Sequence, residues 1–183
     1  MNMNDILKVA EEKMNASVKA MEERFTTVRT GRANPSSLNG VMVEYYGSLT
    51  PLKQLVTISV PEGNQLLIKP FDKTSINDIV KAIVAANLGY NPTSDGESIR
   101  IIVPALTEER RKELIKQVRK IAEDAKIAIR NERRDALDKV KKDDAASEDD
   151  EKRVEKEVQT LVDKSNKKVE EILKQKEEEL MTV

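Results

Sequence analysis

The sequence predicts an α+β protein with two domains, in which a long antiparallel three-helix bundle is interrupted by a small inserted α+β domain of the β/α/β sandwich type. All six prolines and all six glycines of the 183 residues fall between residues 31 and 104. On both sides of that window, apolar residues recur at steps of three and four, the spacing of one helix face. Charged residues make up 36% of the chain and aromatic residues 3%, a composition that favours charge-coated helices with an aliphatic core.

The borders of the Pro- and Gly-containing window set the domain boundaries. We expect residues 1–30 and 105–183 to form the bundle and residues 31–104 to form the insert, with hinges near 30–32 and 103–106. The expected hinge residues are Thr30, Gly31, Pro104 and Ala105. Because the chain crosses between the domains twice, the domains could swivel without opening either core.

Three amphipathic segments predict the helices of the bundle. The first has the apolar stripe Leu7, Ala10, Met14, Val18, Met21, Phe25 and Val28. The second begins after Thr107, a suitable N-cap, and has the stripe Leu114, Val118, Ile121, Ala125, Ala128, Ala136 and Val140. The third begins at a capping box of Ser147 and Asp150 and has the stripe Val154, Val158, Leu161, Ser165, Val169 and Ile172.

The polar link at 143–146 is short, so the second and third helices are expected to lie antiparallel, with the first helix filling the remaining groove. An extended coiled coil that dimerises through the same stripes is the alternative. A monomer is expected, because three stripes of similar length can bury one another within a single chain.

The insert has the pattern of a small α+β unit. Strands are predicted over 41–46, 55–60, 66–68 and 99–103, and a helix over 75–88 with Ser75 as its N-cap and Gly89 as its C-terminal stop. Six basic and six acidic side chains balance within the insert.

Missing residue types narrow the possible functions. The chain has no Cys and no His, which removes thiol nucleophiles, thiolate metal sites and Ser-His-Asp triads. The glycines never fall into a phosphate-binding spacing. We therefore expect no enzyme activity, no catalytic residues, no metal site and no cofactor.

The start of the chain lacks the pattern of a signal peptide, and the longest apolar runs are far too short to span a bilayer, so a cytoplasmic location is expected.

Cations gather on one side of the second helix. Residues 108–142 hold 13 basic and 8 acidic side chains, whereas residues 143–183 hold 8 basic and 14 acidic ones. At about 100° per residue, seven cations fall within a stripe about 100° wide and about 33 Å long, opposite the apolar stripe. They are Lys112, Lys116, Arg119, Lys126, Arg130, Arg133 and Arg134. A rigid rod with such a ridge suits the phosphate backbone of structured RNA.

The residues alone leave a second interpretation of this stripe open. Any long bundle helix has a solvated charged face with i,i+4 pairs, and Glu123 lies within the stripe. Arg29 and Arg32 flank Gly31. Either this segment is an ordinary helix C-terminus, where a cation meets the negative end of the helix and glycine follows, or it is a hinge whose two arginines also contact RNA. The acidic third helix is expected to face solvent or a basic protein.

Five segments, in order along nearly the whole chain, resemble the bacterial ribosome recycling factor family. They are residues 29–35 (RTGRANP), 43–47 (VEYYG), 88–92 (LGYNP), 104–112 (PALTEERRK) and 130–136 (RNERRDA). The resemblance implies a two-domain, L-shaped protein whose bundle lies on the large-subunit RNA of the post-termination ribosome. It also implies that elongation factor G, using GTP, drives subunit separation and that the insert faces this factor. By this resemblance Arg29, Arg32, Arg130 and Arg133 contact RNA.

The family pattern leads us to expect an apolar residue where this chain has Glu132, which lies on the core side of the second helix. A buried unpaired carboxylate would cost several kcal/mol, so we expect partial exposure and either a Lys or Arg partner or a local opening of the bundle. A cytoplasmic helical adaptor or chaperone that clamps a protein partner is the alternative function.

Overall fold

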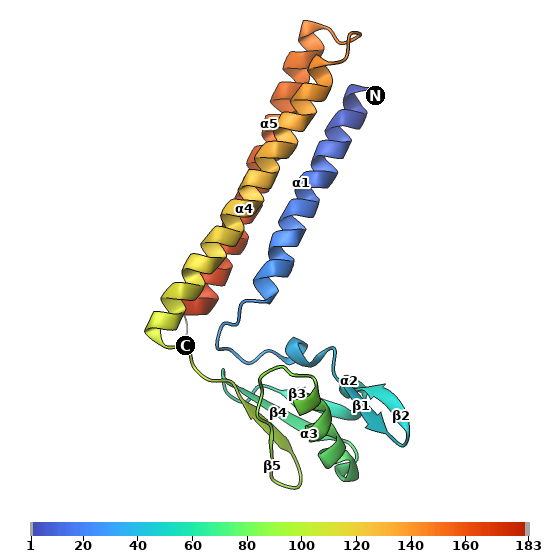
Figure 1. Cartoon of the computed structure of the whole chain (residues 1–183), viewed down its shortest axis with the longest axis vertical. Coiled ribbons are helices and arrows are strands. Elements are labelled where there is room, and N and C mark those ends of the chain that lie inside the picture. Colours follow the sequence, from blue (N-terminus) through green and yellow to red (C-terminus); the bar gives the residue numbers. More distant parts are fainter. Residues whose placement is uncertain (1, 182–183) are drawn as a thin grey trace. The chain divides into compact units, whose positions relative to one another are not determined.

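The computed structural model describes residues 2–181, and these divide into two compact units. Among these residues, one unit comprises residues 2–29 and 108–181, and the other comprises Thr30–Thr107. The first unit is helical, and the second carries the strands of the molecule together with short helices (Figure 1). The predicted α+β fold, a three-helix bundle interrupted by an insert, is confirmed.

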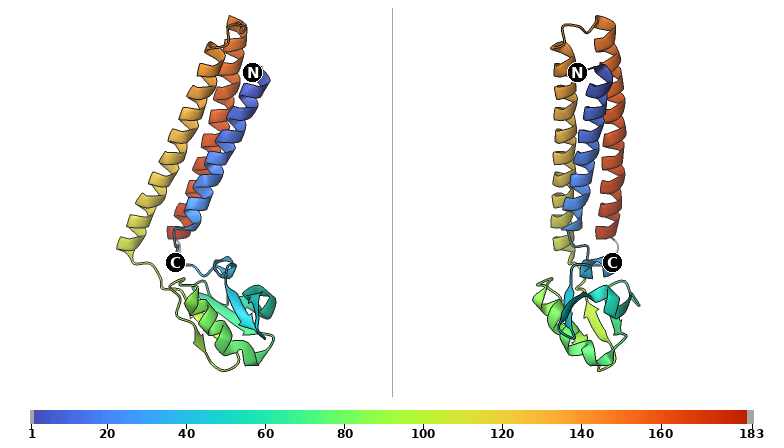
Figure 2. Two further views of the ribbon diagram at one scale, coloured as in Figure 1. Left: turned by 45° about the vertical axis from the view of Figure 1, so that its right-hand side comes forward. Right: turned by 90° about the vertical axis from the view of Figure 1, so that its right-hand side faces the viewer.

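The helical unit consists of α1 (Met3–Thr26), α4 (Glu108–Lys141) and α5 (Glu148–Met181). The three helices lie side by side, and α4 runs antiparallel to both α1 and α5 (Figure 2). Helices α4 and α5 have 34 residues each, which makes each of them about 50 Å long. The helical unit is therefore a rod, and the packing of its helices fixes the direction in which each exposed side chain points.

Side-chain caps define where the helices begin. The side chain of Asn2 accepts a hydrogen bond from the amide of Asp5 at 2.8 Å. The predicted capping box before α5 is present, because the amide of Asp150 donates to Ser147 Oγ and the amide of Ser147 donates to Asp150 Oδ2, each at 3.1 Å. Hydrogen bonds to the Asp150 carboxylate from the backbone and the side chain of Ser147 hold the pKa of Asp150 below its usual value.

The bundle core follows the predicted stripes with local shifts. The buried residue near the start of α1 is Ile6, whereas Leu7 is partly exposed. In the same way Ile129 is buried where Ala128 was predicted to be, and Val162 is buried where Leu161 was predicted to be. Each helix of a three-helix bundle must contact two neighbours, so its buried face is wider than one row of residues. Neighbouring apolar positions therefore compete for the centre.

The inserted unit contains two antiparallel sheets. Strands β1 (Met42–Tyr45) and β2 (Ser48–Pro51) form a hairpin. The second sheet has the order β3 (Val56–Ser59), β4 (Gln65–Pro70), β6 (Ile99–Ile102) and β5 (Thr93–Ser94). The four predicted strands correspond to β1, β3, β4 and β6, although β4 is longer than predicted. Strands β2 and β5 and the short helix α2 (Leu52–Leu55) were missed, because none of them shows apolar alternation.

Helix α3 (Ile76–Ala85) packs against strand β1 of the hairpin and contacts β5 of the larger sheet. Its buried residues Ile76, Ile79 and Ile83 belong to one core cluster with side chains from both sheets. The buried set is aliphatic, as the composition predicts: Leu38, Val41, Val43, Leu52, Val56, Leu66, Ile68, Ile76, Ile79, Ile83, Ile99 and Ile101.

The start of α3 agrees with the prediction, and its end does not. Ser75 is the N-cap residue before Ile76, as predicted, but it has helical dihedral angles and its side chain makes no capping hydrogen bond. Asp72 instead accepts from the amide of Thr74 at 3.0 Å and caps the 3-10 turn that leads into the helix. The helix ends earlier than predicted: Asn87, with a φ of 54°, turns the chain before Gly89 is reached.

Candidate nucleic-acid interface

The seven predicted cations of α4 all lie on the side of that helix away from its buried stripe. Lys112, Lys116, Arg119, Arg130 and Arg134 are exposed, and Lys126 and Arg133 are partly buried. The uninterrupted helical backbone of α4 fixes their angular positions, so the stripe is a rigid feature of the bundle. The seven side chains nevertheless divide into two groups according to what they contact.

Three of the seven turn toward α5. Arg119 Nε donates to Glu177 Oε1 at 2.8 Å, and Lys126 forms an ion pair with Glu170. Arg133 Nε donates to Gln159 Oε1 at 3.0 Å. The hydrogen bond to Glu177 and its charge raise the pKa of Arg119. Arg119 and Lys126 are therefore matched to acidic side chains of the same protein.

The other four form an open ridge, which we define as Lys112, Lys116, Arg130 and Arg134. Each of them is exposed, and within residues 2–181 none has a hydrogen bond or ion pair. By the helical turn they lie about 40° apart at most, on the side of the stripe away from α5. An external anion can reach these cations without displacing a partner.

The divided stripe changes the charge that the bundle presents to solvent. Glu123 is exposed beside Lys126 and lines the groove between α4 and α5 with Arg119 and Glu170. On the other flank of α4, Asp124 pairs with Arg24 of α1 at 3.1 Å. Glu123 therefore lies within the open ridge, at a helical angle between those of Lys112 and Lys116, whereas Asp124 lies on the flank toward α1. The four cations of the ridge are themselves unpaired in the described part of the chain.

Arg29 and Arg32 are both exposed, and each has an interaction within the described chain. Arg29 follows Val28, the last buried residue of the first bundle segment, and Arg32 belongs to the inserted unit. They lie in different units, so their joint action on one RNA stays a prediction.

The predicted hinge residues lie where the insert begins and ends. Gly31 has a φ of 74°, in the region that favours glycine. A Cβ at this position would lie 3.1 Å from Leu106 Cγ and 3.5 Å from the carbonyl oxygen of Pro104. The stretch with Thr30 and Gly31 therefore packs against the stretch with Pro104 and Ala105. The hinge function of these four residues stays a prediction.

Glu132 projects from α4 toward α1, where Ser17 Oγ donates to its Oε1 at 2.7 Å. Its other oxygen, Oε2, is buried and has no hydrogen-bond partner among the described residues. Partial exposure is confirmed, but the expectation of a Lys or Arg partner is wrong: a serine hydroxyl bonds the carboxylate, and Lys13 contributes charge alone. Burial raises the pKa of Glu132, and the bond from Ser17 and the charge of Lys13 offset part of that rise.

The raised pKa predicts how stability depends on pH. The folded state holds the Glu132 proton more tightly than the unfolded state, so this residue stabilises the fold below its unfolded pKa and loses that contribution as pH rises through the folded value. At neutral pH, Glu132→Gln is expected to raise the free energy of unfolding by up to about 1 kcal/mol, after allowance for solvent screening. Urea unfolding at neutral and acidic pH measures this difference. The advantage of the variant should shrink on acidification, and a constant or growing advantage would contradict the assignment.

The inserted unit presents a second exposed surface, which the sequence analysis missed. Tyr45 donates to Asp72 Oδ2 at 2.9 Å, and the ring of Tyr46 packs edge-on against that of Tyr45 at 4.6 Å. Tyr46 and Phe71 are 83% and 73% exposed, although both are aromatic. Hydrogen bonds from Thr74, with the one from Tyr45, lower the pKa of Asp72 and keep this corner charged. The sequence signal was the clustering of aromatic residues in a chain that has only five.

In residues 2–181, no group of three or more acidic side chains is arranged to hold a metal ion. No helix there is long and apolar enough to cross a membrane. The grooves of the bundle are shallow and lined by charged side chains, as between α4 and α5.

Known proteins resemble this chain over its whole length. The family model described as "Ribosome recycling factor" matches residues 21–181. Ribosome-recycling factors of Staphylococcus saprophyticus and Caldicellulosiruptor bescii are 53% and 51% identical, with 99% of this chain and 100% of each relative covered.

Two solved structures resemble the fold. A solution structure of a ribosome recycling factor is 40% identical with a TM-score of 0.82, over 100% of this chain and 99% of that one. The second describes models of the T. thermophilus ribosome recycling factor and E. coli elongation factor G bound to the E. coli post-termination complex. It is 39% identical with a TM-score of 0.64, and both chains are fully covered.

Proposed function

The chain belongs to the ribosome recycling factor family, and from that premise we propose that it binds large-subunit ribosomal RNA through the open ridge of α4 and acts with elongation factor G and GTP to split the post-termination ribosome. The cytoplasm, where ribosomes terminate translation, is its proposed location. The protein contributes binding and mechanical coupling, and GTP hydrolysis belongs to the elongation factor.

The observation that carries this proposal is the open ridge itself. Four unpaired cations follow one side of a continuous helix for about 33 Å, a length over which several backbone phosphates of folded RNA are accessible. Two of the four, Arg130 and Arg134, can grip a phosphate with two donors each. Binding of this type releases counterions and therefore weakens steeply as salt is added.

The contacts of the seven cations also indicate which of them bind RNA and which connect α4 to α5. We assign RNA contact to Lys112, Lys116, Arg130 and Arg134, with Arg133 at the edge of the ridge. Arg119 and Lys126 are already paired with Glu177 and Glu170, so their main role is to tie α4 to α5. Arg29 and Arg32 remain proposed RNA contacts on the strength of the family resemblance.

A subunit-splitting assay tests the function directly. Purified ribosomes with messenger RNA and deacylated tRNA are incubated with this protein, elongation factor G and GTP, and light scattering follows subunit separation. Splitting is expected when all components are present, and omission of this protein, of the elongation factor or of GTP should each abolish it. Splitting that proceeds equally without this protein would contradict the proposal.

The aromatic corner of the insert, defined as Tyr45, Tyr46, Phe71 and Asp72, is the proposed contact for elongation factor G. Large exposed aromatic side chains are typical of protein interfaces. Replacing Tyr46 and Phe71 with Ser should lower the rate of factor-dependent splitting by about tenfold and leave ribosome affinity nearly unchanged. Val84→Ser, which alters another exposed apolar residue of the same unit, is the matched control. Equal losses in the double variant and the control would argue against this surface.

A further inference from the structure

The contacts between α4 and α5 repeat every seven residues in antiparallel register. Arg119 meets Glu177, and seven residues along each helix Lys126 meets Glu170. The next step places Arg133 opposite Asp163. A carboxylate again occupies the α5 position, but the aspartate side chain is one methylene shorter than the glutamates. Within the described residues, Arg133 makes no ion pair there.

Gln159 bridges this third position. Arg133 Nε donates to Gln159 Oε1 at 3.0 Å, and Gln159 Nε2 donates to Asp163 Oδ1 at 2.9 Å. A guanidinium can donate hydrogen bonds but not accept them, whereas an ionised carboxylate can accept but not donate. Only one orientation of the Gln159 amide satisfies both neighbours, so Asp163 fixes the amide and the amide in turn fixes the guanidinium.

The bridge leaves Arg133 oriented yet still charged. The Nε donor is used, while the two terminal nitrogens of the guanidinium have no partner among the described residues. Its partner is a neutral amide, unlike the carboxylate that meets Arg119, so the positive charge of Arg133 is not cancelled. A guanidinium with a free terminal fork, held by its Nε, is suited to grip one phosphate with two hydrogen bonds.

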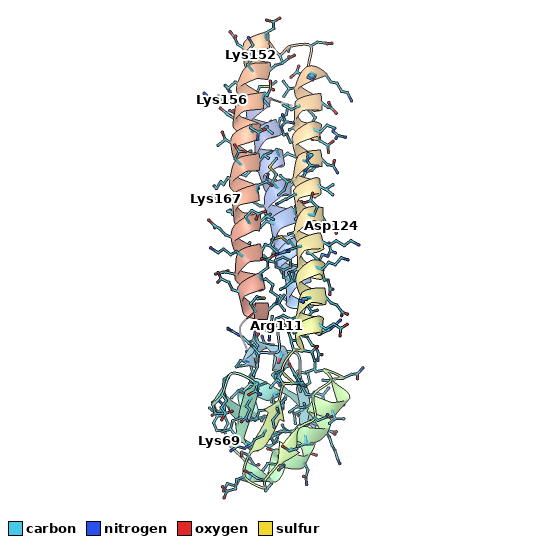
Figure 3. All side chains as sticks on the ribbon, turned by 90° about the vertical axis from the view of Figure 1, so that its left-hand side faces the viewer. Lys69, Arg111, Asp124, Lys152, Lys156 and Lys167 are labelled. Atoms are coloured by element: carbon cyan, nitrogen blue, oxygen red, sulfur yellow. The ribbon has the colours of Figure 1, made fainter. Side chains whose placement is uncertain are left out.

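The surroundings of Arg133 favour an anion at the same place. A shallow groove between α4 and α5, about 440 Å³ in volume, is lined by Arg133 with Lys152 and Lys156 of α5. Figure 3 shows both lysines on α5 close to the link from α4. Glu155 and Asp163 also line this groove, and Asp163 accepts the hydrogen bond from Gln159.

We propose that Gln159, oriented by Asp163, is a positioning residue that holds the guanidinium of Arg133 ready for an RNA phosphate. The proposal rests on the proposed function, in which α4 binds ribosomal RNA. It gives α5, the acidic helix that was expected to face away from RNA, a part in binding. Because Arg133 is ordered before the RNA arrives, less side-chain freedom is lost on association.

The test uses Gln159→Met, which keeps the length of the side chain and removes the hydrogen-bonding amide. In the free protein, the NMR signal of the Arg133 Nε–H group should shift and exchange faster with water, because its acceptor is gone. Affinity for large ribosomal subunits should fall about three- to tenfold, the usual effect of one hydrogen bond. Gln175→Met, the same change at an exposed position further along α5, should alter neither quantity. Helicity and melting temperature should match the unsubstituted protein in both variants.

A double-mutant cycle separates positioning from a general effect. In an Arg133→Ala background, Gln159→Met should cause no further loss of affinity, because the group that it positions is absent. An equal loss in both backgrounds would overturn the proposal. Gln159→Glu keeps the acceptor but adds a negative charge. It should preserve the bonded Nε–H signal while affinity falls and becomes less dependent on salt.

The outcomes also distinguish this proposal from the function on which it rests. If Arg133→Ala weakens binding and Gln159→Met does not, positioning by Gln159 is wrong and RNA binding by α4 stands. If Arg133→Ala leaves affinity for the large subunit unchanged, the proposed function of this residue fails, and the positioning role fails with it.

Discussion

Replacing Arg130 and Arg133 together with Glu is expected to lower affinity for the ribosome by about a hundredfold or more. The change removes two cations from the surface that is proposed to face the phosphates and places two anions there, which RNA would repel. Both side chains lie outside the buried stripe of α4, so helicity should be preserved. The second substitution also breaks the bond to Gln159 and places a carboxylate near Asp163, so a small loss of melting temperature is expected.

The matched control for this variant is reversal of Lys164 and Lys168 to Glu. Both residues are exposed on α5, outside the contacts with α4, and the change in net charge is the same. Affinity is measured by sedimentation with large subunits, and folding by circular dichroism. The ridge variant should lose binding while the control keeps most of it. Similar losses in the two variants would mean that overall charge, and not the ridge, determines affinity.

Gly31→Pro is expected to slow ribosome splitting by roughly tenfold or more, with a much smaller effect on ribosome binding. Proline requires a φ near −65°, whereas Gly31 has a φ of 74°, so the substitution forces the chain out of its observed path. That path packs Gly31 against Leu106 and Pro104 of the second crossing, so both connections to the insert are disturbed. The open ridge, which is proposed to bind RNA, lies on the other unit and should keep its geometry.

Single-turnover splitting and equilibrium binding, measured on the same preparation, separate the two effects. Gly31→Ala should give a weaker form of the same result, because alanine also disfavours a positive φ. Gly40→Ala is the matched control, since a Cβ at that position meets nothing within 4 Å. Equal losses of binding and splitting in Gly31→Pro would contradict a role for this segment in motion.

The bundle could be predicted because its physical signal is long and repetitive. Stripes of apolar residues over 24 to 34 residues leave little freedom in helix phase, and the capping box of Ser147 and Asp150 fixes the start of α5. The buried position can shift by one residue, as from Leu7 to Ile6, because each helix packs against two neighbouring helices at once. A single-helix pattern does not contain that information.

The insert was predicted less completely for a related reason. The hairpin strand β2 is short and largely exposed, and β5 has two residues, so neither leaves a period-two signal. Ser75 was correctly placed before the start of α3, but its side chain makes no cap, and Asp72 caps the 3-10 turn that leads into the helix. Local propensity does not show which side chain makes the hydrogen bond.

The division of the cationic stripe was hidden for a different reason. The helical angles of α4 place Arg119, Lys126 and Arg133 within the stripe, but they do not reveal on which side α5 lies. A signal was present in the sequence: Asp163, Glu170 and Glu177 are spaced by seven residues, like the three cations that they oppose. Pairing two heptad series in antiparallel register would have predicted the contacts. The role of Gln159 depends on side-chain reach and needed the structure.

The salt dependence of binding to isolated large subunits tests the central claim most directly. It compares the unsubstituted protein with a variant in which Lys112, Lys116, Arg130 and Arg134 are all replaced by Gln. If the open ridge binds RNA phosphates, the logarithm of affinity should fall linearly with the logarithm of salt concentration, and the variant should show a slope shallower by about one for each phosphate contact removed. A correctly folded variant with the same affinity and the same slope as the unsubstituted protein would contradict it.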